Sequence, residues 1–266
     1  KITSGGGSVT VVGQGGAIGG SRSYGVLVEL GGQITAGVNG SVDVTGTGGS
    51  GQGQRQYGVA VTGVESGTVH AQIRSSGGNV TVLGQGGGSV AAPDSYGVIV
   101  FDGGQITAGG TGTVSVTGTG GSTASNAQVG VVVIRPDSTI TSEGGSVTVL
   151  GQGGGSGTSA RSFGVEVADQ GQITAGGSGT VTVTGNGGSG SGLNNSGVVV
   201  QNSGSAITTG AGGGSVTITG TAGSGTTRFG VLLLTGGAVT TAGGTILIDG
   251  KKSSPGGESG DVELQG

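Results

Sequence analysis

Residues 144–156 read GGSVTVLGQGGGS, and residues 77–89 read GGNVTVLGQGGGS. The chain has 266 residues, of which 73 are glycine, and a composition this rich in glycine is typical of disordered, low-complexity segments when it has no period. Here, however, valine, threonine and leucine return in the same order between the glycines. Repetition of this kind predicts an ordered repeat protein.

The period is about 33 residues. One series of glycines, most of them preceded by an aromatic residue and all followed by valine, has separations of 33, 39, 33, 34, 33 and 33: Gly25, Gly58, Gly97, Gly130, Gly164, Gly197 and Gly230. Two further series, which start at Val9 and Ile2, keep the same period through eight units. The long gap coincides with the irregular segment VESGTVHAQ. We therefore predict a single domain over residues 1–266 with a loop insertion near residues 64–72.

Each unit contains three short apolar segments with the character of β-strands. They are rich in Val, Ile and Thr, alternate in polarity and are bounded by glycine, a pattern that favours strands over helices. No single unit can bury its own apolar face, so the units must stack. The sequence predicts an all-β fold: a right-handed parallel β-helix, or β-solenoid, of about eight three-stranded coils. The handedness is taken by analogy with βαβ crossovers, and eight coils at about 4.8 Å each give a rod of about 38 Å.

Alternation of polarity assigns the faces of the strands. Val9 and Val11 are expected to point inward and Thr10 outward, and Ile34 inward with Thr35 outward. In the third segment of the first unit we expect Tyr24, Val26 and Val28 to point inward together, with Leu27 outward.

The segments VTVTGTGGS, GVVV and GQITAGG resemble the Gly-rich strand repeats of bacterial exoproteins of the filamentous-haemagglutinin and autotransporter-passenger type. The resemblance covers the whole chain but concerns the style of the repeat. It implies an extracellular, cell-surface β-helix used in adhesion, biofilm matrix or fibres. The chain has no recognisable signal peptide, secretion domain or membrane-spanning run and starts at Lys1, so we expect a mature product or a segment of a longer protein, with no membrane insertion.

The sequence offers little catalytic chemistry. His70, the only histidine, lies in the irregular insertion near Glu65, and the carboxylates are scattered over different repeat positions. There is no cysteine, no metal-binding motif and no recurring Asp of a calcium-binding repeat, so we predict no cofactor. A formal net charge of −4 argues against nucleic acid as a partner. We predict that the chain is not an enzyme, and keep a carbohydrate-active enzyme as a less favoured alternative.

Two repeated surface features suggest other partners. Outward threonines form columns on the first and second segments, as an ice-binding solenoid would show, although Asp43, Arg74 and Leu247 interrupt them and threonine is favoured on any exposed strand. Four arginines precede the third segment at the end of the long loop and could bind acidic glycans or be solvated loop charges: Arg22, Arg55, Arg161 and Arg228.

The outward positions of the third segment are apolar, where polar residues would be expected. Such a strand is normally covered, either by the long loop of its own unit or by a second solenoid, and a Gly/Ser loop has little apolar surface. We therefore favour a lateral interface between solenoids, formed by Leu27, Ile99, Phe101, Val132, Ile134, Val199, Leu232 and Leu234.

The two ends of the sequence match each other in repeat phase. Joined tail to head, they give VELQGKITSGG, which is close to the internal VELGGQITAG. This predicts an end-to-end interface formed by Lys1, Ile2, Thr3, Val262, Leu264 and Gly266, or a window of a longer solenoid. The predicted function is that of an extracellular structural protein, a subunit or segment of a surface filament or biofilm matrix that self-associates. The alternative is a monomeric adhesin stalk that binds glycan or a host surface.

Overall fold

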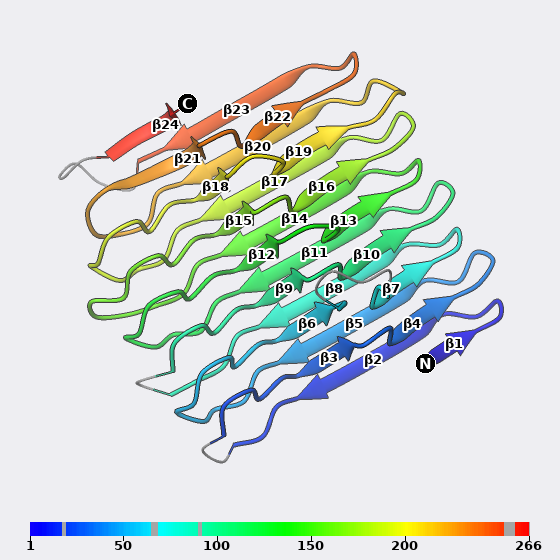
Figure 1. Ribbon diagram of the computed structural model, residues 1–266, viewed down its shortest axis with the longest axis horizontal. Helices are drawn as coiled ribbons and strands as arrows, with labels where there is room; N and C mark the ends of the chain where they lie inside the picture. Colours follow the sequence, from blue (N-terminus) through cyan, green and yellow to red (C-terminus); the bar gives the residue numbers. More distant parts are fainter. Residues whose placement is uncertain (18–19, 65–68, 90–91, 253–258, 266) are drawn as a thin grey trace.

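The computed structural model describes residues 1–17, 20–64, 69–89, 92–252 and 259–265. Over these residues the chain has no helix and forms three parallel sheets of eight strands, and each turn of the coil adds one strand to each sheet (Figure 1). The predicted β-solenoid, its three strands per coil and its period are therefore confirmed.

The three sheets contain every third strand of the chain. The first sheet consists of β1 (Ile2–Ser4), β4 (Gln33–Ala36), β7 (Gln72–Ser75), β10 (Gln105–Ala108), β13 (Thr139–Ser142), β16 (Gln172–Ala175), β19 (Ala206–Thr209) and β22 (Ala238–Thr240). The second consists of β2 (Val9–Gln14), β5 (Val42–Thr47), β8 (Val80–Gln85), β11 (Val114–Thr119), β14 (Val147–Gln152), β17 (Val181–Asn186), β20 (Val216–Thr221) and β23 (Ile246–Lys251). The third consists of β3 (Val26–Glu29), β6 (Val59–Thr62), β9 (Val98–Phe101), β12 (Val131–Ile134), β15 (Val165–Ala168), β18 (Val198–Gln201), β21 (Arg228–Leu234) and β24 (Ser259–Gln265).

The main core runs along the axis of the coil. Equivalent residues of successive units pair in register, so that Ile106 lies beside Ile73 and Ile140, and these three side chains are fully buried. Val9 is buried and Thr10 exposed, as predicted from the alternation. Burial of each Val or Ile contributes roughly 1.5–3 kcal/mol, and the β-branched side chain suits a parallel sheet whose inner face is closed. Stacking of coils therefore supplies the stability that no single coil has.

Two columns of glycine close the corner between the second and third sheets. A Cβ placed on Gly118, in β11, would lie 2.7 Å from the carbonyl carbon of Gly130, which precedes β12. A Cβ on Gly97 would lie 2.6 Å from the carbonyl oxygen of Gly130 in the next coil. Backbone meets backbone at this corner, so the repeat needs glycine on both sides of it.

The long repeat places its extra residues between β6 and β7. Nevertheless β7 pairs in register with both neighbours, since Gln72 lies opposite Gln33 and Gln105, and its Nε2 donates to Gln105 Oε1 at 2.9 Å. The wall of the solenoid is thus unchanged across the insertion. Residues 65–68, including Glu65, belong to the predicted loop insertion and lie outside the described residues.

Inward side chains at the two ends of the stack lack the neighbour that covers them elsewhere. Ile2 in the first coil is 48% exposed, whereas Ile34, its partner in the second coil, is 4% exposed. In the last coil Ile246 is 45% and Leu264 68% exposed. Of the residues predicted for an end-to-end contact, Gly266 lies outside the described range.

Candidate functional site

The outer face of the third sheet is covered by a second apolar cluster, distinct from the main core. The residues predicted for a lateral interface point away from the axis, as expected. Four of them are nevertheless buried within the single chain: Ile99, Val132, Val199 and Leu232 are 6%, 2%, 1% and 8% exposed. Phe101, Ile134 and Leu234 are half-buried against the same cluster, and Leu27 is 37% exposed. These four side chains do not require a second solenoid to leave water, and lateral association stays a prediction.

The cover comes from residues that immediately precede the strands. Tyr57 and Phe163 are buried in this cluster, and Tyr24 packs against it. The prediction that Tyr24 points inward with Val26 is therefore wrong. The physical reason is the close approach at Gly25, where the chain turns before β3 begins at Val26, so the alternation of the strand does not extend back to the tyrosine.

Side chains at this position form a column parallel to the axis, which we call the aromatic column. In each coil the following glycine donates its N–H to the carbonyl of the next column residue, as Gly58 does to Tyr96 at 3.0 Å. Three tyrosine rings are stacked, with centroids 5.3 Å apart for Tyr24 and Tyr57 and 4.9 Å apart for Tyr57 and Tyr96. The column over the first seven coils consists of Tyr24, Tyr57, Tyr96, Val129, Phe163, Ser196 and Phe229.

The tyrosines are partly withdrawn from water, and the Tyr96 hydroxyl donates to Asp94 Oδ1 at 3.3 Å. Burial raises the pKa of Tyr57 and of Tyr96 far above the usual range, and Asp94 acts in the same direction on both. The pKa of Tyr24 is also raised by burial, against the opposing effect of Arg22 and Arg55.

A column of left-handed residues borders the aromatic column on the loop side. The residue two positions before each column residue has positive φ, for example 67° at Arg22, 63° at Arg55 and 57° at Arg161. Arg228 is one position later in its repeat and is only 5% exposed, so the four arginines do not form one equivalent set. Across the sheet, Arg135 pairs with Asp102 at 2.8 Å.

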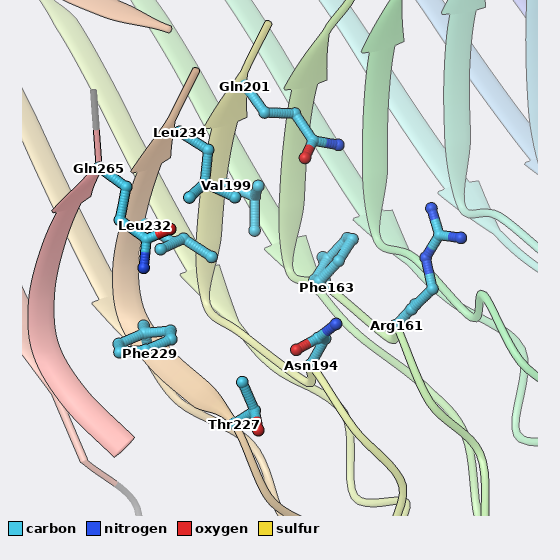
Figure 2. Close-up of a pocket in the computed structure, with 10 residues that line it drawn as sticks. All are labelled: Arg161, Phe163, Asn194, Val199, Gln201, Thr227, Phe229, Leu232, Leu234 and Gln265. Atoms are coloured by element: carbon cyan, nitrogen blue, oxygen red, sulfur yellow. The ribbon is translucent and has the colours of Figure 1, made fainter. Parts of the chain in front are cut away.

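The outer face of the third sheet is hollowed between the left-handed column and the Arg135–Asp102 pair, and we call this hollow the third-sheet groove. It holds two cavities of about 350 Å³ each, and Arg161 lines both of them. One cavity lies beside the tyrosines and includes Glu166 and the Arg135–Asp102 pair. Figure 2 shows the other, which is lined by Phe163, Phe229, Val199 and Leu232 among others, with Asn194 close to Phe163 and Phe229 well apart from both. A mostly apolar hollow with a few convergent polar groups is the usual form of a binding site.

Glu166 is an acidic residue in an outward column of the third sheet, with Val132 and Val199 beside it. Burial raises its pKa to about 7, although Arg161 and a 2.8 Å hydrogen bond from Gln201 Nε2 favour the carboxylate. The sequence analysis did not select this residue. A carboxylate with a valine on either side of it in a repeat column is the signal that could have found it.

The remaining features predicted from the sequence make contacts along the wall of the solenoid. His70 Nδ1 lies 2.9 Å from the carbonyl oxygen of Gly103, which holds the histidine against the wall of the neighbouring coil. The threonine columns are in register, with Thr3 and Thr35 hydroxyls 3.0 Å apart, and Arg74, which interrupts one column, forms an ion pair with Glu143 at 3.5 Å. Within the described ranges no group of three His, Cys, Asp or Glu residues could hold a metal ion. Nor does this part of the chain contain a helix long and apolar enough to cross a membrane.

Comparison with known proteins adds no relative. No protein-family model matches the sequence, and no curated protein or solved structure is significantly similar to the chain. Functional inference therefore starts from the geometry of the solenoid and of its groove.

Proposed function

We propose that the chain is a structural segment of an extracellular β-solenoid rod that grows by the stacking of further coils. The observation that carries the proposal is the exposure of inward residues at both ends of the stack. Ile2 and Leu264 belong to columns that are fully covered in the middle of the rod, and here they are 48% and 68% exposed. Exposed strand edges with apolar side chains favour the addition of another strand.

The two ends are compatible in chemistry. Both present one edge of all three parallel sheets and inward aliphatic side chains, as each internal coil presents to the next. A second copy stacked in phase would bury Ile2 and Val11 against Val239 and Ile248, which are equivalent members of the same columns. The extracellular location is supported by the resemblance in repeat style described above.

The test compares two neighbouring residues of β23 that face opposite sides. Ile246→Lys puts an ammonium into the inward column at the end of the stack, whereas Leu247→Lys changes an outward side chain that is 58% exposed. We expect electron microscopy of the purified chain to show rods longer than the single-chain length of about 38 Å. Ile246→Lys should abolish them and Leu247→Lys should preserve them.

Two results would contradict the proposal. One is a chain that stays monomeric at every concentration, and the other is equal elongation of both variants. Circular dichroism and thermal unfolding of each variant would show that the remaining coils keep their fold. The mass of the dissociated natural material distinguishes non-covalent stacking, at 24.5 kDa, from a longer chain that continues the coil.

A further inference from the structure

The outer face of the second sheet alternates between long and short side chains from one coil to the next. Its strands read VTVVGQ, VTVLGQ and VTVLGQ in the first, third and fifth coils, and VDVTGT, VSVTGT and VTVTGN in the second, fourth and sixth. In the middle outward column, Val12, Leu83 and Leu150 are 76%, 44% and 41% exposed. Less exposed threonines alternate with them in register: Thr45, Thr117 and Thr184. The face therefore carries an aliphatic ridge on every second coil, about 9.6 Å from the next ridge.

This face is open to water at its aliphatic residues and nearly free of charge. Asp43 is the one charged residue on the six strands, and it lies in the outward column at the margin of the face. The outer faces of the other two sheets carry charge among the corresponding strands, for example Arg74 in the first sheet and Glu166 in the third. Exposed aliphatic side chains that recur in line on an uncharged surface are typical of a protein interface.

A second copy of the chain presents a surface that fits this one. A twofold axis that lies between the two faces, along the strands, reverses the direction of the second solenoid and places each outward column opposite itself. When the first six coils of both copies overlap, coil one faces coil six, coil two faces coil five, and coil three faces coil four. Every aliphatic residue of the middle column then faces a threonine of the other copy: Val12 faces Thr184, Leu83 faces Thr117, and Leu150 faces Thr45. Parallel solenoids related by a twofold axis along the rod would instead place each ridge against itself.

The area of this contact is sufficient for a specific dimer. Each strand has six residues, or about 20 Å, and six strands span about 29 Å, so each copy contributes about 580 Å² and the pair buries about 1,160 Å². Specific interfaces exceed about 1,000 Å² when the two surfaces are complementary. The last two coils stay outside the contact, so the ion pair of Lys251 and Asp249 in β23 remains solvated.

We propose that the outer face of the second sheet is a self-association surface, on which two copies of the solenoid pair antiparallel through their first six coils. Val12, Leu83 and Leu150 are its apolar anchors. This is not the face of the third sheet, where Ile99 and Val132 are already covered within the chain. Pairing widens a rod and does not lengthen it, so the proposal goes beyond the end-to-end stacking proposed above and does not depend on it.

Sedimentation equilibrium tests the pairing in the Ile246→Lys chain, in which end-to-end stacking is blocked and any remaining association is lateral. We expect a species of twice the chain mass of 24.5 kDa. Adding Leu150→Lys should raise the dissociation constant by about a hundredfold or more, because the twofold axis places the substitution in the interface twice. Thr107→Lys, on the outer face of the first sheet, is the matched control and should leave the dissociation constant unchanged.

A second substitution tests which coils face each other. Thr45→Asp should restore pairing to the Leu150→Lys chain, because it sets a carboxylate opposite the ammonium group of the other copy. Thr219→Asp adds the same charge in β20, beyond the six paired coils, and should not restore it. Circular dichroism of each variant would show that the solenoid remains folded.

The proposal is overturned if the Ile246→Lys chain stays monomeric at every concentration, if Leu150→Lys leaves the dimer unchanged, or if Thr45→Asp and Thr219→Asp restore pairing equally. Should Ile246→Lys not fold, electron microscopy of the otherwise unchanged chain decides instead. Particles two solenoids wide that become one solenoid wide with Leu150→Lys support the pairing, and particles of one width in both chains refute it.

Discussion

Glu166 should make the stability of the solenoid depend on pH in a way that one substitution removes. Its carboxyl group is buried beside Val132 and Val199 on the outer face of the third sheet, and its pKa is raised by burial to about 7 from the ordinary value of 4.5. The folded chain therefore binds this proton more tightly than the unfolded chain does. Protonation of Glu166 stabilises the fold.

The sign and the size of the effect follow from this difference. The stabilisation is fully present below about pH 4.5 and is lost as the pH rises through about 7. At about 1.4 kcal/mol for each pH unit, the interval from 4.5 to about 7 corresponds to a loss of about 3 kcal/mol of unfolding free energy. Glu166→Gln keeps an oxygen to accept the hydrogen bond from Gln201 and carries no charge. The variant should match the original chain at low pH and exceed it by about 3 kcal/mol at pH 8.

Denaturant unfolding of both chains at intervals between about pH 4 and 8 measures this difference, since other titrating groups are common to both and largely cancel. Glu29→Gln is the control: it removes an exposed carboxylate of β3, which is separated from β15 by three strands of the same sheet, and should leave a nearly constant difference across the range. A difference between Glu166→Gln and the original chain that does not change with pH would show that the carboxyl group is hydrated in solution, and the structural argument would be refuted.

Two further outcomes test the corner and the aromatic column. Gly97→Ala should lower the free energy of unfolding by about 2–4 kcal/mol, because the added Cβ would lie 2.6 Å from the carbonyl oxygen of Gly130. Thermal unfolding of this variant is compared with that of Gly5→Ala, where the added Cβ has open space, and equal midpoints would contradict the close approach. Burial raises the pKa of Tyr57 and Tyr96, so spectrophotometric titration should show fewer of the three tyrosines ionised at about pH 11 in the native chain than in the denatured chain. Identical titration curves would mean that the tyrosine stack is open to water.

The wall of the solenoid could be predicted from the sequence because its rules are local. Alternation places Val9 inward and Thr10 outward within one strand, and a constant spacing then stacks each residue on its equivalent in the next unit. The same spacing across eight units predicted the number of coils. No contact between residues far apart in the sequence had to be predicted separately, since the strand pairing of one coil repeats that of the coil before it.

The groove could not be predicted in the same way. Alternation was extended from Val26 back to Tyr24, across the turn at Gly25, and this assigned the tyrosine to the wrong side of the sheet. The cover of Ile99 and Val132 was sought in the loops or in a second solenoid, whereas it comes from column residues just before the strands. The recurrence of aromatic residues at Tyr24, at Tyr57 and in later units carried this information, because rings one coil apart must stack.

The unbroken register across the longest connection separates two properties of the molecule. Strand β7 takes its place between β4 and β10 although its repeat is 39 residues long instead of 33. The pairing of the strands therefore does not depend on the length of the connection at that corner. Closing a longer loop costs only about 0.6 kcal/mol for each doubling of its length. The corner between β6 and β7 is thus a natural site for inserting a foreign peptide, which the rod would display at a fixed position without any change to its scaffold.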